Sequence, residues 1–575
     1  MKDETEPNGP ILKGTAFSTP NSELRTPYSF FAVAIVAAIG CVPIIGQPIQ
    51  VDDPLFLGVA KQILETPANP YGGTPTWHDG DWFSQNANPP LWSYLLAATA
   101  ALFGWNETAF HVLQCFANIA LAYGIFALAR RICTRPLFWT SACLLSPFLL
   151  PGRNLMADTL LLALWCWSFE FFLQDALDGR RGRGVWAGLL ASAALLTKYT
   201  GGLLVPIFIL LCLRWKAFRL WAWLLPILAF ALWCGHNQYY YGRTHFFANV
   251  GSGGLGLFDR ARVVTRIVGG MVFWGPVWLF AAWVAGGGWK KFLIPLSLPA
   301  AIGFAAADFY DVIHRFSSGG VDAQSDLVLH FAVFIALGFL LIASLIVSTV
   351  GAGCDDSERR ARFALILWLG LATAFNLLAT SAVAFGAVRH LLIVFVPAIL
   401  LGGGAFDRAS GDRPWLRVLA WATLLVSAGL GGVLAHGDRL SASAGSEAAD
   451  ETATLIAQGN AVWTAGDPAL RYMTERLGAH WWHGEMERLP VDGLVVTTYF
   501  RSLAFRSHPV LMKQSVLQRK ISLESWNRFR TQSTYASFYG ANLLTLPWMA
   551  ETSKYSKGPK GGWEYDLILI SRRVR

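Results

Sequence analysis

Long apolar stretches alternate with short polar linkers from residue 30 to residue 435, and the stretches have 13 to 23 residues each. A helix that crosses a bilayer needs about 20 mainly apolar residues. We therefore expect about thirteen transmembrane helices, the pattern of a mainly α-helical polytopic membrane protein. The stretches lie at residues 30–48, 109–129, 137–151, 158–174, 185–199, 201–213, 219–236, 264–286, 292–307, 328–350, 363–385, 390–405 and 416–435.

The charges of the linkers predict how the chain is oriented. Lys and Arg cluster in alternate linkers, for example in ARRICTR (129–135) and DGRRGRG (178–184). Clustered Lys and Arg residues stay on the cytoplasmic side, so the N-terminus is expected inside and the C-terminal tail outside. The regions expected on the outer face are 49–108, 236–260, 308–326 and everything after about residue 436.

One further apolar run, Pro89–Gly104, breaks this alternation. It has 16 residues and begins with two prolines. A crossing at this point would turn the linker 129–135 and every later basic linker outward. We therefore expect the run to form a helix that lies in the outer interface.

The pattern changes after about residue 436. Runs typical of β-strands occur at 493–499 and 565–572, and a helical pattern occurs at 467–478. These runs predict a C-terminal soluble α/β domain outside the membrane. The predicted divisions are a cytoplasmic tail at 1–29, a transmembrane domain at 30–435 that includes the outer loop 49–108, and the α/β domain at 436–575.

Composition agrees with a membrane protein. Of 575 residues, 54% are hydrophobic and 14% are charged, and the mean hydropathy is +0.42. The net charge is +9, but most basic residues lie in short linkers, so membrane orientation explains them better than a nucleic-acid partner. The eight cysteines lack metal-ligand spacing, and the absence of Walker A, GxSxG and HExxH motifs argues against an ATP-driven pump, an esterase and a zincin.

Carboxylates occur at the predicted outer ends of two spans. Asp52 and Asp53 follow the first apolar stretch directly. Acids beside a span are costly to dehydrate, so the pair can act as a general base, bind a metal or simply end the span. Asp158 opens a later span at the same face, where an Asp in the first turn also stabilises a helix by itself.

Cations occur at the same face. Lys198 ends one apolar run, and Arg389 and His390 begin another. Each can extend to the interface or contact lipid headgroups, or it can bind a phosphate in an outer cavity. Three cationic and two acidic positions at one face favour a shared site.

A weaker candidate lies in TWHDGDWF (76–83). His78, Asp79 and Asp81 are close enough in sequence to bind a metal, although such a segment is usually a polar turn. This segment and the acidic pair allow a divalent metal without requiring one.

Five short motifs follow one another between residues 30 and 405. They are DDPLFLGVAKQIL, NPPLWSYLLAATAALFG, the Asp158 that opens a span, LTKYTGGLLVP and RHLLIVFVP. This order resembles the membrane-integral glycosyltransferases of the GT-C class, especially the branch of the lipid A aminoarabinose transferase and the protein O-mannosyltransferases. The resemblance implies a GT-C fold.

The resemblance also implies a reaction and its partners. It implies inverting transfer of one sugar from a polyprenyl-phosphate donor, on the outer face of the bacterial inner (plasma) membrane. The acceptor would be lipid A or lipopolysaccharide core, another surface glycan, or a protein. Asp52 would be the general base, with Asp53 and Asp158 as further site acids. Lys198, Arg389 and His390 would bind the donor phosphate.

Two positions depart from this family pattern. Asp53 stands where relatives usually have Glu, and Asn88 stands where the aminoarabinose transferases have Lys. The donor or acceptor is therefore expected to differ from theirs. Two other functions stay open: a polytopic transporter or lipid-linked glycan flippase, and a membrane scaffold whose outer domain binds glycan. No internal repeat is evident and the charges cluster at span ends, which favours the enzyme.

Overall fold

The structure of the protein is a computed structural model. It describes residues 27–50, 52–73, 81–249, 356–383, 388–410, 414–465, 468–482, 489–498, 515–525 and 563–573. The predicted spans 264–286, 292–307 and 328–350 lie outside the described residues, and so does the outer region 308–326.

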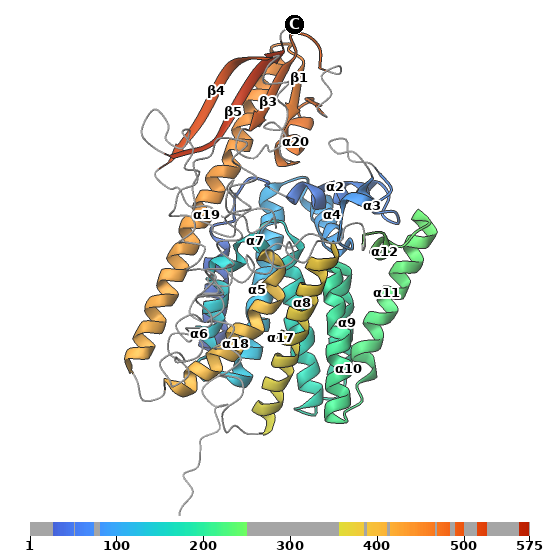
Figure 1. The fold of residues 1–575 in the computed structure, drawn as a ribbon, viewed down its shortest axis with the longest axis vertical. Helices are drawn as coiled ribbons and strands as arrows, with labels where there is room; N and C mark the ends of the chain where they lie inside the picture. The colour runs from blue at the N-terminus through green and yellow to red at the C-terminus, as the bar shows by residue number, and fades with distance from the viewer. Residues whose placement is uncertain are drawn as a thin grey trace, which may run out of the picture.

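A bundle of long helices forms the body of the molecule (Figure 1). Within it α5 packs against α8, α8 against α9, α9 against α11, and α17 against α18. The bundle helices are α1 (Pro27–Cys41), α5 (Glu107–Ile132), α6 (Pro136–Leu144), α8 (Ala157–Ala176), α9 (Arg183–Thr197), α10 (Leu204–Trp215), α11 (Leu220–Tyr241), α17 (Asp356–Val383), α18 (Leu392–Ala409) and α19 (Pro414–Ala457).

By length and composition, four helical segments of the described residues could each cross a membrane. They are Glu107–Ile132, Leu220–Tyr241, Arg389–Arg408 and Pro414–Ala457. Four further apolar helices of the described part are shorter, for example Arg183–Thr197. The total of thirteen spans stays a prediction.

Several predicted spans have different bounds in the structure, and the first, 30–48, is cut short because α1 ends at Cys41. The run 137–151 is not one helix: α6 ends at Leu144 and is followed by η2 (Pro147–Leu149) and α7 (Leu150–Arg153). Pro147 has no N–H to continue the helix, and the Ser146 side chain accepts a hydrogen bond from the N–H of Phe148. The last predicted span, 416–435, lies within a longer helix, because α19 continues to Ala457.

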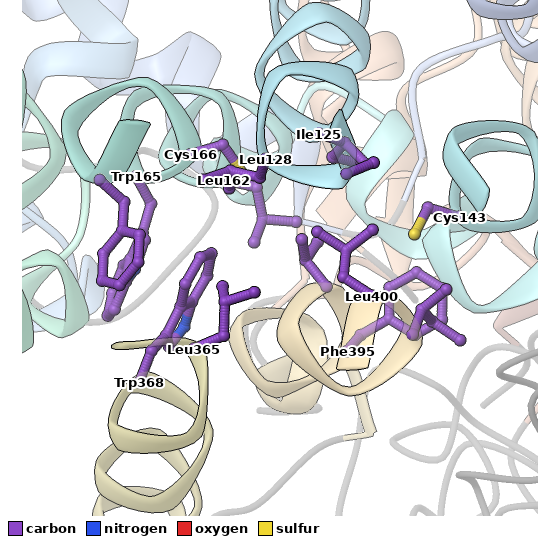
Figure 2. Packing of buried hydrophobic residues seen from close by; sticks show 14 of the residues in the cluster. Ile125, Leu128, Cys143, Leu162, Trp165, Cys166, Leu365, Trp368, Phe395 and Leu400 are labelled. Carbon is purple, nitrogen blue, oxygen red and sulfur yellow. The ribbon is translucent and has the colours of Figure 1, made fainter. Parts of the chain in front are cut away.

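The bundle core packs aromatic and aliphatic side chains of α5, α8, α17 and α18 against one another (Figure 2). Trp165 stacks on Trp368 with ring centroids 5.6 Å apart. The indole N–H of Trp368 donates to the carbonyl oxygen of Ile393 over 2.8 Å. This bond fixes the first turn of α18, directly after Arg389 and His390.

Short helices lie at the end of the bundle that is nearest the sheet (Figure 1). They are α2 (Asp53–Glu65), α3 (Trp82–Gln85), α4 (Leu91–Phe103) and α12 (His245–Asn249). The run predicted at Pro89–Gly104 corresponds to α4, which has 13 residues and packs against α2. It is too short to cross a bilayer alone.

A five-stranded sheet follows α19, with strand order β2-β1-β3-β5-β4. β1 pairs in parallel with β2 and β3, whereas β5 pairs antiparallel with β3 and β4. The strands are β1 (Val462–Ala465), β2 (His480–Trp481), β3 (Leu494–Thr498), β4 (Ser515–Ser525) and β5 (Trp563–Arg573), and α20 (Pro468–Glu475) follows β1.

The secondary structure that the sequence predicts in the tail is present. β3 covers most of 493–499, β5 contains 565–572, and α20 lies within 467–478. The division of the chain at residues 29 and 435 into separate domains stays a prediction.

Candidate active site

A cavity of about 290 Å³ contains five of the six residues expected to act as site acids or to bind the donor phosphate. Asp52, Asp158, Lys198, Arg389 and His390 all line it, together with apolar side chains from α2, α8 and α18. Two of them, Asp52 and Arg389, are 337 positions apart in the chain. Residues that the sequence placed at the ends of separate apolar runs therefore line one cavity.

Asp52 lies at the N-cap of α2 but does not cap it with its side chain. Its carboxylate accepts instead from Arg389, with 2.8 Å between Oδ2 and Nη1. The Asp52 side chain is 30% exposed and the Arg389 side chain 10%. One oxygen of a partly accessible carboxylate is thus held by a cation in the same cavity.

A second ion pair joins Asp158 and Lys198, with 2.7 Å between Oδ1 and Nζ. Asp158 lies in the first turn of α8. Two hydrogen bonds of 2.8 Å hold the turn before it. The Gln114 amide donates to the carbonyl of Gly152, and the Trp92 indole donates to the carbonyl of Leu155. Both side chains of the pair are largely buried, so each charge depends on the other for compensation.

The backbone at Lys198 turns sharply between α9 and η3 (Tyr199–Leu203). Lys198 is extended at φ −156° and ψ 136° and ends α9. Gly201 then passes so close to α9 that a Cβ there would lie 2.3 Å from the carbonyl carbon of Ala194. The glycine in the TKYTGG motif therefore permits the turn that brings Lys198 to Asp158.

Asp53 is not brought into the cavity. Its side chain is fully buried, and Oδ2 accepts from the N–H of Gln50 over 3.0 Å. Burial raises the pKa of this carboxyl to about 8, so it holds its proton at neutral pH. The structure therefore separates the two adjacent acids: Asp52 faces the cavity and Asp53 faces the protein interior.

Of the metal candidates, His78 and Asp79 lie outside the described residues. Asp81 caps α3, where its side chain accepts from the N–H of Ser84 over 2.9 Å, and it pairs with Arg243 at 3.5 Å. Across the described segments, no group of three or more His, Cys, Asp or Glu could hold a metal ion. Asp81 is explained by its capping role.

A neutral wall of the cavity was not predicted. It consists of Asn86, Ala87 and Asn88 from the loop before α4, whereas Tyr199 and Thr200 from η3 line the cavity separately. The Asn86 side chain accepts from the N–H of Asn88 over 3.0 Å, which shapes the loop. The sequence signal for this wall is the pair of asparagines before Pro89, because Asn often forms local side-chain-to-backbone turns.

Residues 87–237 match the family model described as dolichyl-phosphate-mannose-protein mannosyltransferase. This match confirms the resemblance drawn from the motifs. The matched segment contains Asn88, Asp158, Lys198 and Tyr199 of the cavity. No curated protein matches the chain.

The chain also matches solved structures at low sequence identity. ArnT from Cupriavidus metallidurans bound to undecaprenyl phosphate has a TM-score of 0.40 and 12% identity, and the match covers 95% of this chain and 98% of that one. AglB from Archaeoglobus fulgidus, an oligosaccharyltransferase in complex with an inhibitory peptide and a dolichol-phosphate, has a TM-score of 0.43 and 11% identity over 85% and 70% of the two chains. The arabinofuranosyltransferase AftD from Mycobacteria has a TM-score of 0.41 and 13% identity over 95% and 41%.

Proposed function

We propose that this protein is an inverting membrane glycosyltransferase that moves one sugar from a polyprenyl-phosphate donor to an envelope acceptor. The observation that carries the proposal is the presence of two ion pairs, Asp52–Arg389 and Asp158–Lys198, in one cavity. Each pair combines a carboxylate that could accept a proton with a cation that could bind a phosphate. The reaction needs both chemistries at one place.

The cations suit the leaving group. When the bond between the sugar C1 and the phosphate oxygen breaks, negative charge develops on the lipid phosphate. Lys198 and Arg389 line the cavity and could bind that charge directly, with His390 beside them. A donor phosphate that takes Arg389 would also free the Asp52 carboxylate from its cation.

Asp52 is proposed as the general base. A hydroxyl of the acceptor would donate its proton to the Asp52 carboxylate as its oxygen forms the new bond to C1 from the face opposite the phosphate. The sugar configuration inverts in this single displacement. Asp158 would hold Lys198 in place through the 2.7 Å ion pair. Asp53 is proposed to support the N-terminus of α2 rather than to touch the substrate.

The surroundings of the cavity fit a lipid-linked donor. Apolar side chains such as Leu161 and Ile393 complete its lining, and the bundle below is apolar over long helices. A polyprenyl tail could therefore stay in the bilayer while the sugar phosphate enters the cavity. We place this site on the periplasmic face of a bacterial inner membrane, with lipid A, lipopolysaccharide core, another glycan or a protein as acceptor.

The test is mass spectrometry of envelope glycolipids, glycans and glycoproteins from cells with the wild-type chain, no chain or the Asp52→Asn variant. Loss of a general base lowers a rate by about 100- to 10,000-fold. We expect one sugar mass to disappear without the chain and to stay absent with Asp52→Asn at equal membrane levels. Restoration of the wild-type profile by Asp52→Asn would remove Asp52 as the base.

Glu65→Gln provides the matched control. Glu65 ends the same helix α2 as an exposed carboxylate, and it does not line the cavity. Its neutralisation changes the charge of α2 by the same amount as Asp52→Asn. We expect this variant to restore the sugar completely.

A further inference from the structure

A buried chain of hydrogen bonds outside the cavity joins two of its walls. The Trp233 indole N–H donates to the Tyr199 hydroxyl over 3.0 Å. Tyr199 Oη lies 2.7 Å from His245 Nδ1, and His245 Nε2 lies 2.6 Å from the carbonyl oxygen of Asn86. Tyr199 and Asn86 line the cavity, whereas His245 and Trp233 are not among its lining residues.

When the His245 ring is neutral, one arrangement of protons satisfies the three bonds. An indole N–H can only donate and a carbonyl can only accept. His245 must therefore donate from Nε2 to Asn86, and it must accept at Nδ1 the hydroxyl proton of Tyr199. This assignment requires a neutral imidazole, because a doubly protonated ring has no acceptor.

The site of His245 is built to keep the ring neutral and fixed. The side chain is fully buried and stacks on Tyr71 with ring centroids 5.1 Å apart, while Phe83 meets it edge-on at 4.9 Å. Burial lowers the pKa of His245 to about 4. The ring can therefore keep the donor and the acceptor that the bond chain needs throughout the neutral range.

The same cluster holds both ends of the cavity loop. His245 binds the carbonyl of Asn86, and the Tyr71 hydroxyl donates to the carbonyl of Asn88. At the other end of the bond chain, Tyr199 follows Lys198 directly. The bond chain therefore links the neutral loop wall to the backbone that carries the Lys198–Asp158 pair.

We propose that His245 is a positioning residue that sets the distance between the Asn86–Asn88 loop and the Lys198–Tyr199 turn, so that the cavity fits the headgroup of the donor. Its effect on donor binding rests on the proposed function. Its effect on the loop is a property of the fold alone. The two effects are measured separately.

The variants are His245→Phe and Tyr199→Phe in the full chain in lipid nanodiscs. Each keeps an aromatic ring and removes bonds of the chain. His236→Phe and Tyr241→Phe are the matched controls, because both residues belong to the same aromatic cluster without bonding a lining residue. His236 binds the carbonyl of Ala68 at 2.7 Å, and Tyr241 accepts from the N–H of Tyr71 at 3.1 Å.

The first measurement is hydrogen–deuterium exchange of the amides of residues 86–88. We expect exchange to rise at least tenfold in His245→Phe and Tyr199→Phe and to stay near wild type in both controls, with similar melting temperatures for all four. His245→Gln keeps one donor and one acceptor and is expected to recover part of the protection. If exchange in His245→Phe matches that in His236→Phe, the positioning role is wrong, whatever the chain transfers.

The second measurement is binding of a short-chain polyprenyl phosphate without sugar. We expect the dissociation constant to rise about tenfold in His245→Phe and Tyr199→Phe but not in the controls. Unchanged binding alongside increased exchange would overturn the donor-fitting part of the inference. If the wild-type chain binds no polyprenyl phosphate, the proposed function fails, and the exchange data still decide whether His245 positions the loop.

Discussion

At the scale of single residues, the two adjacent acids show that the surrounding protein determines whether a carboxyl group is accessible and charged. Asp52 meets the Arg389 guanidinium in a cavity, whereas Asp53 is buried and its Oδ2 accepts from the backbone N–H of Gln50. One carboxyl is accessible to a substrate and the other is neutral and enclosed. Their neighbouring positions at the start of α2 point them in different directions.

The buried Asp53 makes stability depend on pH. Its pKa is about 8 in the folded protein, raised by burial, and the ordinary value is 3.8. The folded state thus keeps a proton that the unfolded state releases, so stability from this group is lost as pH rises from about 4 towards 8. Asp53→Asn is expected to raise the melting temperature by several degrees at pH 8.5 and by less at pH 5.

Thermal unfolding of the full chain at the two pH values checks this. Glu65→Gln is the control, since an exposed carboxylate on the same helix gains nothing from losing its charge. The assignment of Asp53 as a neutral buried acid would be contradicted if the difference in melting temperature between Asp53→Asn and wild type were the same at pH 5 and pH 8.5.

The sequence could identify charged candidates but not their partners. Charges at the ends of apolar runs are expensive, so Asp52, Asp158, Lys198 and Arg389 are visible without a structure. Which acid pairs with which cation depends on packing between segments up to 337 residues apart. The bond chain through His245 was missed for the same reason, because its links span 46 and 159 residues.

At the scale of elements, the length of an apolar stretch in the sequence predicts that a helix is present but predicts poorly where the helix ends. The missed break at Ser146–Pro147 depends on a proline and a capping serine inside an apolar run. The missed continuation of α19 depends on burial of small residues such as Ala442, Ala448 and Ala449 beyond the apolar stretch. Such residues allow close packing but have little hydropathy of their own.

Close packing between α9 and α11 gives the prediction at this scale. A Cβ at Gly188 would lie 2.1 Å from the carbonyl oxygen of Trp221, so Gly188→Ala forces the two helices apart. We expect it to destabilise the protein by about 1–3 kcal/mol. Gly235 of α11 has open space around the same position, and Gly235→Ala should be neutral or stabilising by up to about 1 kcal/mol.

Thermal unfolding of both variants in the same detergent measures the difference. The two substitutions add the same methyl group to a helical glycine, so helix propensity cancels between them. Equal melting temperatures for Gly188→Ala and Gly235→Ala would show that α9 and α11 are not in close contact at this point.

At the scale of the whole molecule, α19 and α20 connect the sheet to the layer that carries the site (Figure 1). α19 has 44 residues and is therefore about 66 Å long, roughly twice the hydrocarbon thickness of a bilayer. α20 packs against α2, whose N-cap is Asp52. The strands β1, β2 and β4 were not predicted, because short or polar segments form strands mainly through pairing and packing with neighbouring strands.

The contact between α20 and α2 predicts that the sheet region supports the proposed sugar transfer. Ala469 of α20 is 1% exposed and shares a hydrophobic cluster with Phe56 and Leu57 of α2. A carboxylate at this position would be buried without a partner, which is costly enough to separate the two helices. We therefore expect Ala469→Asp to expose α2 to limited proteolysis and to reduce sugar transfer strongly in the mass-spectrometric assay. Leu477→Asp adds the same charge at the exposed end of this region and should change neither result. Full transfer by an Ala469→Asp protein whose α2 is cleaved would show that the sheet region is dispensable for the reaction.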